Sequence, residues 1–321
     1  MKKVKSFISN NVSLVGLLLV IIIGALISST FLSLENIRNV TRSASITGFI
    51  AMGMTFVILC GSIDLSVGAV FSLAGYFFIT LANTSPILAI VVPIVVGLFI
   101  GLINGTLITK LGIPSFMATL SMMLLTRGVV LMCSGETTIK GSLSTGMEFL
   151  GRGVIADVLS VPLILFVIGI FLTSYILKRR AIGRAMYTVG GNAEAAKMMG
   201  VSVTRTMIVA HMICGALAGV AGILFASRVG SASPLAGSGY EMYAIAAAVI
   251  GGADLNGGKG KMSGTFVGAL IIGSFTNIFT LQNILDPVWE NVVIGAILLI
   301  VVVAQSVTQL FGTRKKVKVE Y

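Results

Sequence analysis

Residues 178–205 read KRRAIGRAMYTVGGNAEAAKMMGVSVTR and form the one long polar interruption in an otherwise apolar chain. The stretch carries six cations and a single acid, Glu194. Long apolar segments precede and follow it, so we expect it to lie outside the lipid. Segments rich in Lys and Arg favour the cytoplasmic side of a membrane, which predicts an inner loop here.

Residues 193–199 of this loop read as a short helix of good helix formers. Asn192 is the expected N-cap, and Gly200 is the expected stop. A helix of this length is marginal in water, so it must pack against something. It is either a capped connector between two spans or a docking helix for a partner protein.

The loop resembles a known motif. Glu194-Ala195-Ala196, followed after three residues by Gly200, is similar to the "EAA…G" loop of ABC importer permeases, a cytoplasmic helix that sits in a cleft of the ATPase subunit. The lead-in, 183–192, resembles the version found in bacterial monosaccharide permeases of the ribose, galactose and xylose type. The resemblance implies that the following residues couple the chain to an ATPase: Gly190, Gly191, Asn192, Glu194, Ala195, Ala196 and Gly200.

Composition independently indicates an integral membrane protein. The 321 residues are 56% hydrophobic and 10% charged, with a mean hydropathy of +1.05. The net charge of +11 does not indicate nucleic-acid binding, because the main groups of cations fall on one side when the apolar segments are threaded in turn. This threading places both termini inside.

The apolar pattern predicts an all-α, polytopic fold with about ten transmembrane helices in a single domain, 1–321. The expected spans are 12–32, 46–60, 69–81, 86–109, 113–132, 161–177, 206–226, 240–250, 262–279 and 288–305. Residues 36–42 are then an outer connection, and 134–160 the largest outer loop. Glycines four residues apart at 97, 101 and 105, and at 215 and 219, predict close helix packing.

Residues 61–68, GSIDLSVG, form a polar break between the second and third predicted spans. A polar break at membrane depth is tolerated only where protein or water covers the freed backbone groups. Asp64 is the expected cap of the helix that follows. The octet is similar to the "GGIDLSVG" signature of the same sugar permeases, with Ser62 in place of the second glycine.

Residues 251–258, GGADLNGG, match that octet at four of eight positions and suggest a weak internal repeat. The stretch 251–264 is also similar to the family's glycine-rich inner loop. Together the two stretches supply these signature and helix-cap candidates: Gly61, Asp64, Leu65, Ser66, Gly68, Asp254, Gly257 and Gly258. Gly260-Lys261 is followed by Met262, so the loop is not a P-loop, and any ATP is bound and hydrolysed by another polypeptide.

The ionisable residues argue against an enzyme or an ion-coupled carrier. None of the eleven acids lies near the middle of a predicted span, whereas ion-coupled carriers usually need a carboxylate there. His211 is the only histidine, with no acid near it in sequence, so we expect a hydrogen-bonded interior residue and no metal site. Cys60, Cys133 and Cys214 imply no disulfide framework.

A pathway for an uncharged polar solute needs small polar and aromatic side chains. Residues 113–128 resemble the "IPPFIATLGM…RG" stretch of the family, with Ser115 and Ser121 as departures, and Arg127 there is either functional or snorkels to an interface. The candidates for lining a pathway are Phe116, Met117, Thr119, Arg127, Asn277 and Gln282.

The resemblance implies a bacterial cytoplasmic-membrane permease that works as a pair, in contact with membrane lipid, an ABC ATPase and an extracytoplasmic sugar-binding protein. ATP binding would then rock the pair between inward- and outward-facing states. Two alternatives remain: a related permease for branched-chain amino acids or nucleosides, and an ion-coupled sugar carrier. The sequence does not name the sugar.

Overall fold

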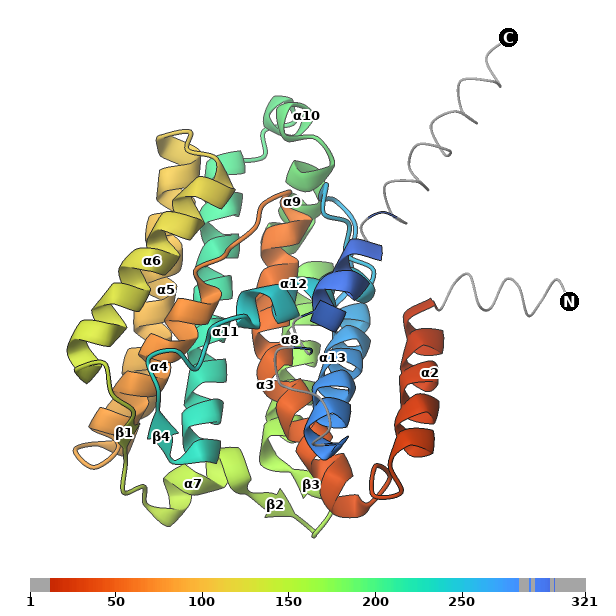
Figure 1. Ribbon diagram of the computed structural model, residues 1–321. Helices are drawn as coiled ribbons and strands as arrows, with labels where there is room; N and C mark the ends of the chain where they lie inside the picture. The colour runs from red at the N-terminus through yellow and green to blue at the C-terminus, as the bar shows by residue number, and fades with distance from the viewer. Residues whose placement is uncertain (1–11, 283–288, 290–291, 301–302, 304–321) are drawn as a thin grey trace, which may run out of the picture.

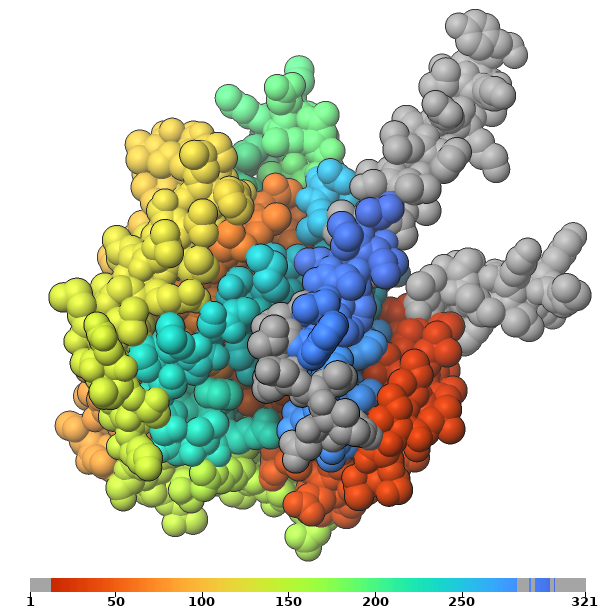
Figure 2. Space-filling view, in the orientation of Figure 1, coloured from red at the N-terminus to blue at the C-terminus, as the bar shows by residue number. Residues whose placement is uncertain are grey.

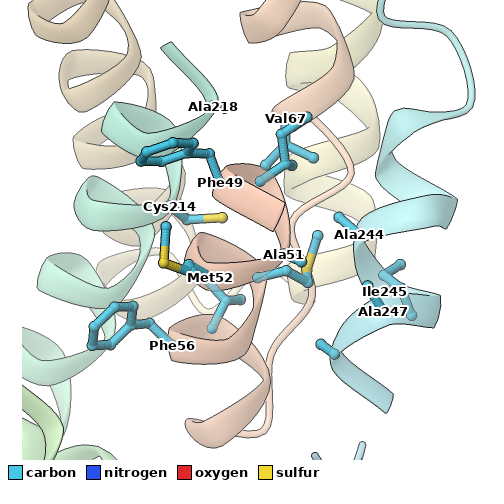
Figure 3. Close-up of a cluster of buried hydrophobic side chains, with 14 of the residues drawn as sticks. Phe49, Ala51, Met52, Phe56, Val67, Cys214, Ala218, Ala244, Ile245 and Ala247 are labelled. Atoms are coloured by element: carbon cyan, nitrogen blue, oxygen red, sulfur yellow. The ribbon is translucent and has the colours of Figure 1, made fainter. Parts of the chain in front are cut away.

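Helix α3 (Leu34–Leu59) runs through the middle of a helical bundle in the computed structural model, which describes residues 12–282, 289, 292–300 and 303 (Figure 1). Every residue of α3 from Ala44 to Leu59 is buried. Side chains of α3 such as Met52 and Phe56 pack with Cys214 and with alanines of neighbouring helices (Figure 3). Small partners let several helices approach α3 at once.

Apolar helices surround α3. Their bounds are α2 (Val12–Ile27), α4 (Val67–Leu81), α5 (Pro86–Lys110), α6 (Ser115–Ser134), α8 (Val161–Arg179), α11 (Val203–Val229), α12 (Tyr240–Ile250) and α13 (Met262–Gln282). Within the described residues, six helices are long and apolar enough to cross a membrane, namely α3, α5, α6, α8, α11 and α13, and α2, α4 and α12 are shorter apolar helices. The prediction of an all-helical polytopic membrane protein is confirmed. Of the predicted span 288–305, the structure describes residues 289, 292–300 and 303, which are helical.

One end of the bundle is covered by short elements from the predicted outer loops (Figure 1). They are helix α7 (Thr145–Arg152) and the antiparallel strand pairs β1 (Ile139–Lys140) with β4 (Ser231–Ala232), and β2 (Val154–Ile155) with β3 (Leu159–Ser160). The predicted loop 134–160 is therefore largely structured.

Residues 36–42, which we expected to form an outer connection, lie at the end of the bundle that carries the predicted outer loops, but they are the first turns of α3. Ser33 caps α3 by accepting a hydrogen bond from the Asn36 amide at 3.3 Å, so the helix begins at Leu34 and continues through this polar stretch. Arg38 and Arg42 donate to the backbone carbonyls of Asp157 and Arg152, which lie in the loops at the same end of the bundle. These contacts explain why charged residues extend a helix whose apolar part begins twelve residues later, at residue 46.

The prediction that both glycine stripes allow close helix packing is confirmed, and the structure shows that the two stripes face each other. An added Cβ on Gly97 or Gly215 would overlap the carbonyl of the other residue, and one on Gly101 would overlap the His211 carbonyl. Gly219 likewise faces the backbone at Pro93. Helices α5 and α11 therefore touch backbone to backbone, as small-residue stripes allow in a membrane.

The polar loop 178–205 forms two helices, α9 (Ala181–Gly191) and α10 (Ala193–Met198), at the end opposite the strands (Figure 1). The sequence predicted only the second of them. Gly190 and Gly191 are the last two residues of α9.

Candidate functional site

Helix α10 has the predicted cap and stop. The Asn192 Oδ1 accepts a hydrogen bond from the Ala195 amide at 2.9 Å, which satisfies one of the free donors of the first turn. Gly200 ends the segment with φ +80°, in the left-handed region that favours glycine. The helix is one residue shorter than predicted, ending at Met198.

None of the described residues covers the outer face of α10. Ala196 is buried against the bundle, whereas Glu194 is exposed, and Met198 and Met199 are 90% and 66% exposed. The segment projects from the end of the molecule (Figure 2). Exposed methionines beside an acid form an adaptable surface that is both apolar and charged. Such a surface is more typical of a docking helix than of a connector surrounded by water.

The base of this segment is locked to both glycine-rich signatures. Gly258 N donates to the Leu59 carbonyl at 2.9 Å, and a Cβ on Gly190 would overlap that same carbonyl and the Gly258 nitrogen. A Cβ on Gly257, whose φ is +91°, would meet Gly190 and the Gly61 nitrogen. The ends of α3 and α9 and the loop after α12 therefore meet with no side chain between them.

A hydrogen bond adds to this junction. The Tyr187 hydroxyl donates to the Gly260 carbonyl at 2.8 Å, and burial of the ring raises the pKa of Tyr187 above its usual value. The carboxylate of Asp254 accepts from the Asn256 amide at 3.1 Å and from Lys259 at 3.3 Å. Burial raises the pKa of Asp254, but these hydrogen bonds outweigh it, and the net pKa lies below the usual value.

Asp64 lies at the centre of a buried polar cluster. Its Oδ1 accepts from the Ser66 amide at 3.0 Å and from the Ser66 hydroxyl at 2.6 Å, and its Oδ2 lies 3.0 Å from His211 Nδ1. Asn104 donates to Ser66 Oγ at 2.9 Å and, more weakly, to the carboxylate at 3.4 Å. Asp64 and His211 are 1% and 0% exposed. Three segments, the break after α3, α5 and α11, are thus joined through one carboxylate.

The tautomer of His211 follows from its partners. An ionised carboxylate only accepts hydrogen bonds, so Nδ1 carries a proton and donates to Asp64. Nε2 lies 3.0 Å from the Ser62 hydroxyl, which can either donate or accept. Ser62, His211 and Asp64 therefore form a chain of the kind seen in nucleophilic active sites, but all three are buried, and this arrangement gives no access to a substrate.

Two predictions about this cluster need correction. His211 does have an acid beside it, Asp64, because the break folds back onto α11. Asp64 does not cap α4: its bond goes to the amide of Ser66, which is itself the N-cap residue of α4 and makes no side-chain cap bond. Asp64 closes a local turn one residue before the helix. Asp254 makes the equivalent bond to the Asn256 amide, so the two matched octets share this turn.

The carboxylate of Asp64 lies deeper in the bundle than the predicted inner ends of α5 and α11, the helices whose side chains bond it. Asn104 is six residues from the end of α5 and His211 eight residues from the start of α11, which places the cluster about 9–12 Å inside. A carboxylate does therefore occur at membrane depth. Both of its oxygens accept hydrogen bonds from protein donors, so it does not offer an open cation site.

The other signature residues have packing roles. Leu65 joins the main apolar core. A Cβ on Gly68 would overlap the Gly237 carbonyl and the carboxylate of Glu241, a buried residue at the start of α12. The first turns of α4 and α12 thus meet, and Gly237 N donates to Ser72 Oγ at 2.9 Å. No sequence pattern indicated the roles of Asn104 or Glu241, whereas Ser62 was marked as the departure from the signature.

The pathway candidates do not converge. On α6, Phe116 and Met117 are 56% and 59% exposed, whereas Thr119 is buried and donates to the Ser115 carbonyl at 2.8 Å. Arg127 is half-buried. Asn277 lies on α13, on the other side of the bundle (Figure 1), in a pair of 2.8 Å hydrogen bonds with Asn36. The side chain of Gln282 lies outside the described residues.

Comparison of the sequence with known proteins shows the family. Residues 36–302 match the family described as "Branched-chain amino acid transport system / permease component". The chain belongs to this permease family. It is 34% identical to the ribose import permease of Escherichia coli K12, covering 95% of this chain and 96% of that protein, and 39% identical to the ribose import permease of Bacillus subtilis 168, covering 89% of each.

Relatives named for other sugars match as well. The D-allose transport system permease of Escherichia coli K12 is 35% identical over 88% of this chain and 86% of its own length. The xylose transport system permease of Haemophilus influenzae is 31% identical, with 85% and 89% covered. No solved structure matches the chain. The relationship therefore rests on sequence over nearly the full length of each permease.

Proposed function

We propose that this protein is the membrane-spanning permease subunit of an ATP-binding-cassette importer for a monosaccharide of the ribose type. It is a single domain with ten spans, the tenth at 288–305, in a bacterial cytoplasmic membrane, with both termini inside. It works as a pair with a second copy. A separate ATPase binds and hydrolyses ATP, and an extracytoplasmic sugar-binding protein delivers the solute.

The observation that carries the proposal is the placement of α10. Its outer face is exposed, and its base touches the end of α3 and the glycine-rich loop after α12 through Gly190, Gly257 and Gly258. A partner that displaces α10 therefore pushes on the central helix of the bundle without a compliant side chain between them. Because packed interfaces switch rather than deform gradually, such contacts suit transmission of a domain movement.

The solute assignment rests on chemistry and on relatives. The relatives at 31–39% identity are named for ribose, allose and xylose, which are all uncharged polyhydroxylated molecules. The carboxylate of Asp64 accepts only protein donors, which favours energy from ATP over an ion gradient. The family description leaves branched-chain amino acids as the second candidate solute.

The first test is co-purification from detergent followed by mass spectrometry. A two-domain ATPase and, after crosslinking, a secreted sugar-binding protein are expected, and the ligand of that binding protein identifies the solute. A binding protein that holds leucine or a nucleoside would transfer the assignment to the related class. A chain that purifies alone and accumulates sugar under an ion gradient in liposomes would overturn the proposal.

The second test reverses the charge on α10. Glu194→Lys is expected to abolish ATP-driven sugar uptake and to weaken ATPase co-purification while the protein still inserts and folds. Glu148→Lys, at another acid with an exposed side chain, on α7 at the opposite end, is the matched control and is expected to leave both unchanged. Unchanged uptake in Glu194→Lys would refute the docking role.

A further inference from the structure

A cavity of about 920 Å³ opens on the flank of the bundle between α2, α8 and the start of α13. Helix α2 stands at the edge of the molecule beside α13, so this flank faces the surroundings of the bundle (Figure 1). The upper wall carries Lys178, Lys259 and Lys261. The deeper wall includes Leu14, Phe171 and Val267. The cavity is thus basic at one end and apolar along its length.

The basic end has more positive charge than the described residues compensate. Asp254 bonds Lys259 at 3.3 Å. No carboxylate of the described residues forms an ion pair with Lys178 or Lys261. All three lysines are exposed. Two cations therefore remain available to an anion at the mouth of the cavity.

The apolar part runs into the depth of the membrane. Phe171 lies seven residues before Lys178 on α8, which places it about 10 Å further from the inner end. A small soluble anion would pair with the lysines but leave this apolar wall in water. A zwitterionic lipid would cover the wall but bring no net charge to the lysines. An anionic phospholipid satisfies both parts.

We propose that this cavity is a binding site for one anionic phospholipid. The phosphate and headgroup lie between Lys178 and Lys261, and an acyl chain follows α8 past Phe171 and Val267. The glycine-rich loop that carries Lys259 and Lys261 also holds Gly257 and Gly258 against the end of α9. A bound lipid therefore stabilises that loop. If the protein is an ATP-driven importer, as proposed above, the lipid also strengthens the coupling between the ATPase and the membrane helices.

The test compares phosphatidylglycerol with phosphatidylcholine on the purified full-length chain in mixed micelles, with retained lipid counted by native mass spectrometry. Wild type is expected to retain one phosphatidylglycerol in preference to phosphatidylcholine. Lys178→Gln/Lys261→Gln removes two cations near the surface and is expected to weaken phosphatidylglycerol binding about 30-fold. Lys110→Gln/Arg205→Gln removes two exposed cations of the same face outside the cavity and is expected to leave binding unchanged.

A second variant tests the apolar wall. Val267→Trp fills the cavity without a charge change and is expected to lower phosphatidylglycerol retention while its melting temperature in phosphatidylcholine stays that of wild type. The proposal is overturned if both lipids bind equally, if the Lys110/Arg205 control loses as much, or if glycerol phosphate competes as well as the lipid does. The lipid count needs no ATPase, so its failure is separate from failure of the transport assignment.

Discussion

Removing His211 is the sharpest test of the buried cluster. His211→Ala leaves the Asp64 carboxylate at 1% exposure without its cationic or N–H partner. Breaking a buried pair by deleting one member typically costs about 3–5 kcal/mol. The bonds from Ser66 and Asn104 remain, so we expect the lower end, about 3 kcal/mol. For a protein of this size that corresponds to a fall in melting temperature on the order of 5–10 °C.

The assay is thermal melting of the detergent-solubilised full chain. The readout is the fraction of protein that stays monodisperse on size-exclusion chromatography after heating. Ser227→Ala, on the same helix, is the control: it removes one buried hydrogen bond, from the Ser227 hydroxyl to the Met147 carbonyl, worth about 1 kcal/mol. A double-mutant cycle adds Asp64→Asn, which removes the charge but keeps the shape.

The cycle has a definite expected sign. Because the neutral amide no longer needs a partner for a charge, Asp64→Asn/His211→Ala should melt higher than the sum of the two single losses predicts, by a coupling of about 1–3 kcal/mol. A His211→Ala protein that melts within the shift of the Ser227 control, or strictly additive losses, would refute the reading of the cluster as a charge-dependent junction.

Three further outcomes follow from the contacts. Gly190→Ala would force its methyl group against the Leu59 carbonyl, so we expect about 1–3 kcal/mol of destabilisation and loss of uptake, with insertion retained; wild-type uptake would contradict the junction. Asn192→Ala should cost α10 about 1 kcal/mol, seen as faster amide hydrogen exchange in that helix alone. Asn36→Ala and Asn277→Ala should each lower stability by about 1–2 kcal/mol, and the double variant by little more than either, since they share one amide pair; additive losses would contradict that pairing.

Much of this fold could be predicted from local pattern. Apolar runs longer than about 17 residues indicate spans, and the i, i+4 glycines correctly marked α5 and α11 as helices that another backbone approaches closely. The cap and stop of α10 followed from Asn192 and Gly200, because capping depends on residues only a few positions apart. Predictions of this kind need no knowledge of what lies across the bundle.

The start of α3 could not be predicted, because it depends on contacts with residues far away in sequence. Arg38 and Arg42 are helical because carbonyls more than a hundred residues away accept their hydrogen bonds. The partner of His211 was equally hidden, since Asp64 lies 147 residues away in sequence. The pathway candidates also failed to converge within one chain, because a residue type suited to a sugar does not specify the face of the helix on which it lies.

Two routes lead from α10 to the break at 60–66. One is by contact: Gly190, three residues before the start of α10, faces the Leu59 carbonyl at the end of α3. The other runs along the chain: α11 begins five residues after α10 ends, and its His211 bonds Asp64. The break is only seven residues long and is held both at Leu59 and at Asp64. A movement transmitted to one of these residues therefore strains the contact at the other. If a partner displaces α10, as the proposed function requires, we therefore expect α3 and α11 to move together.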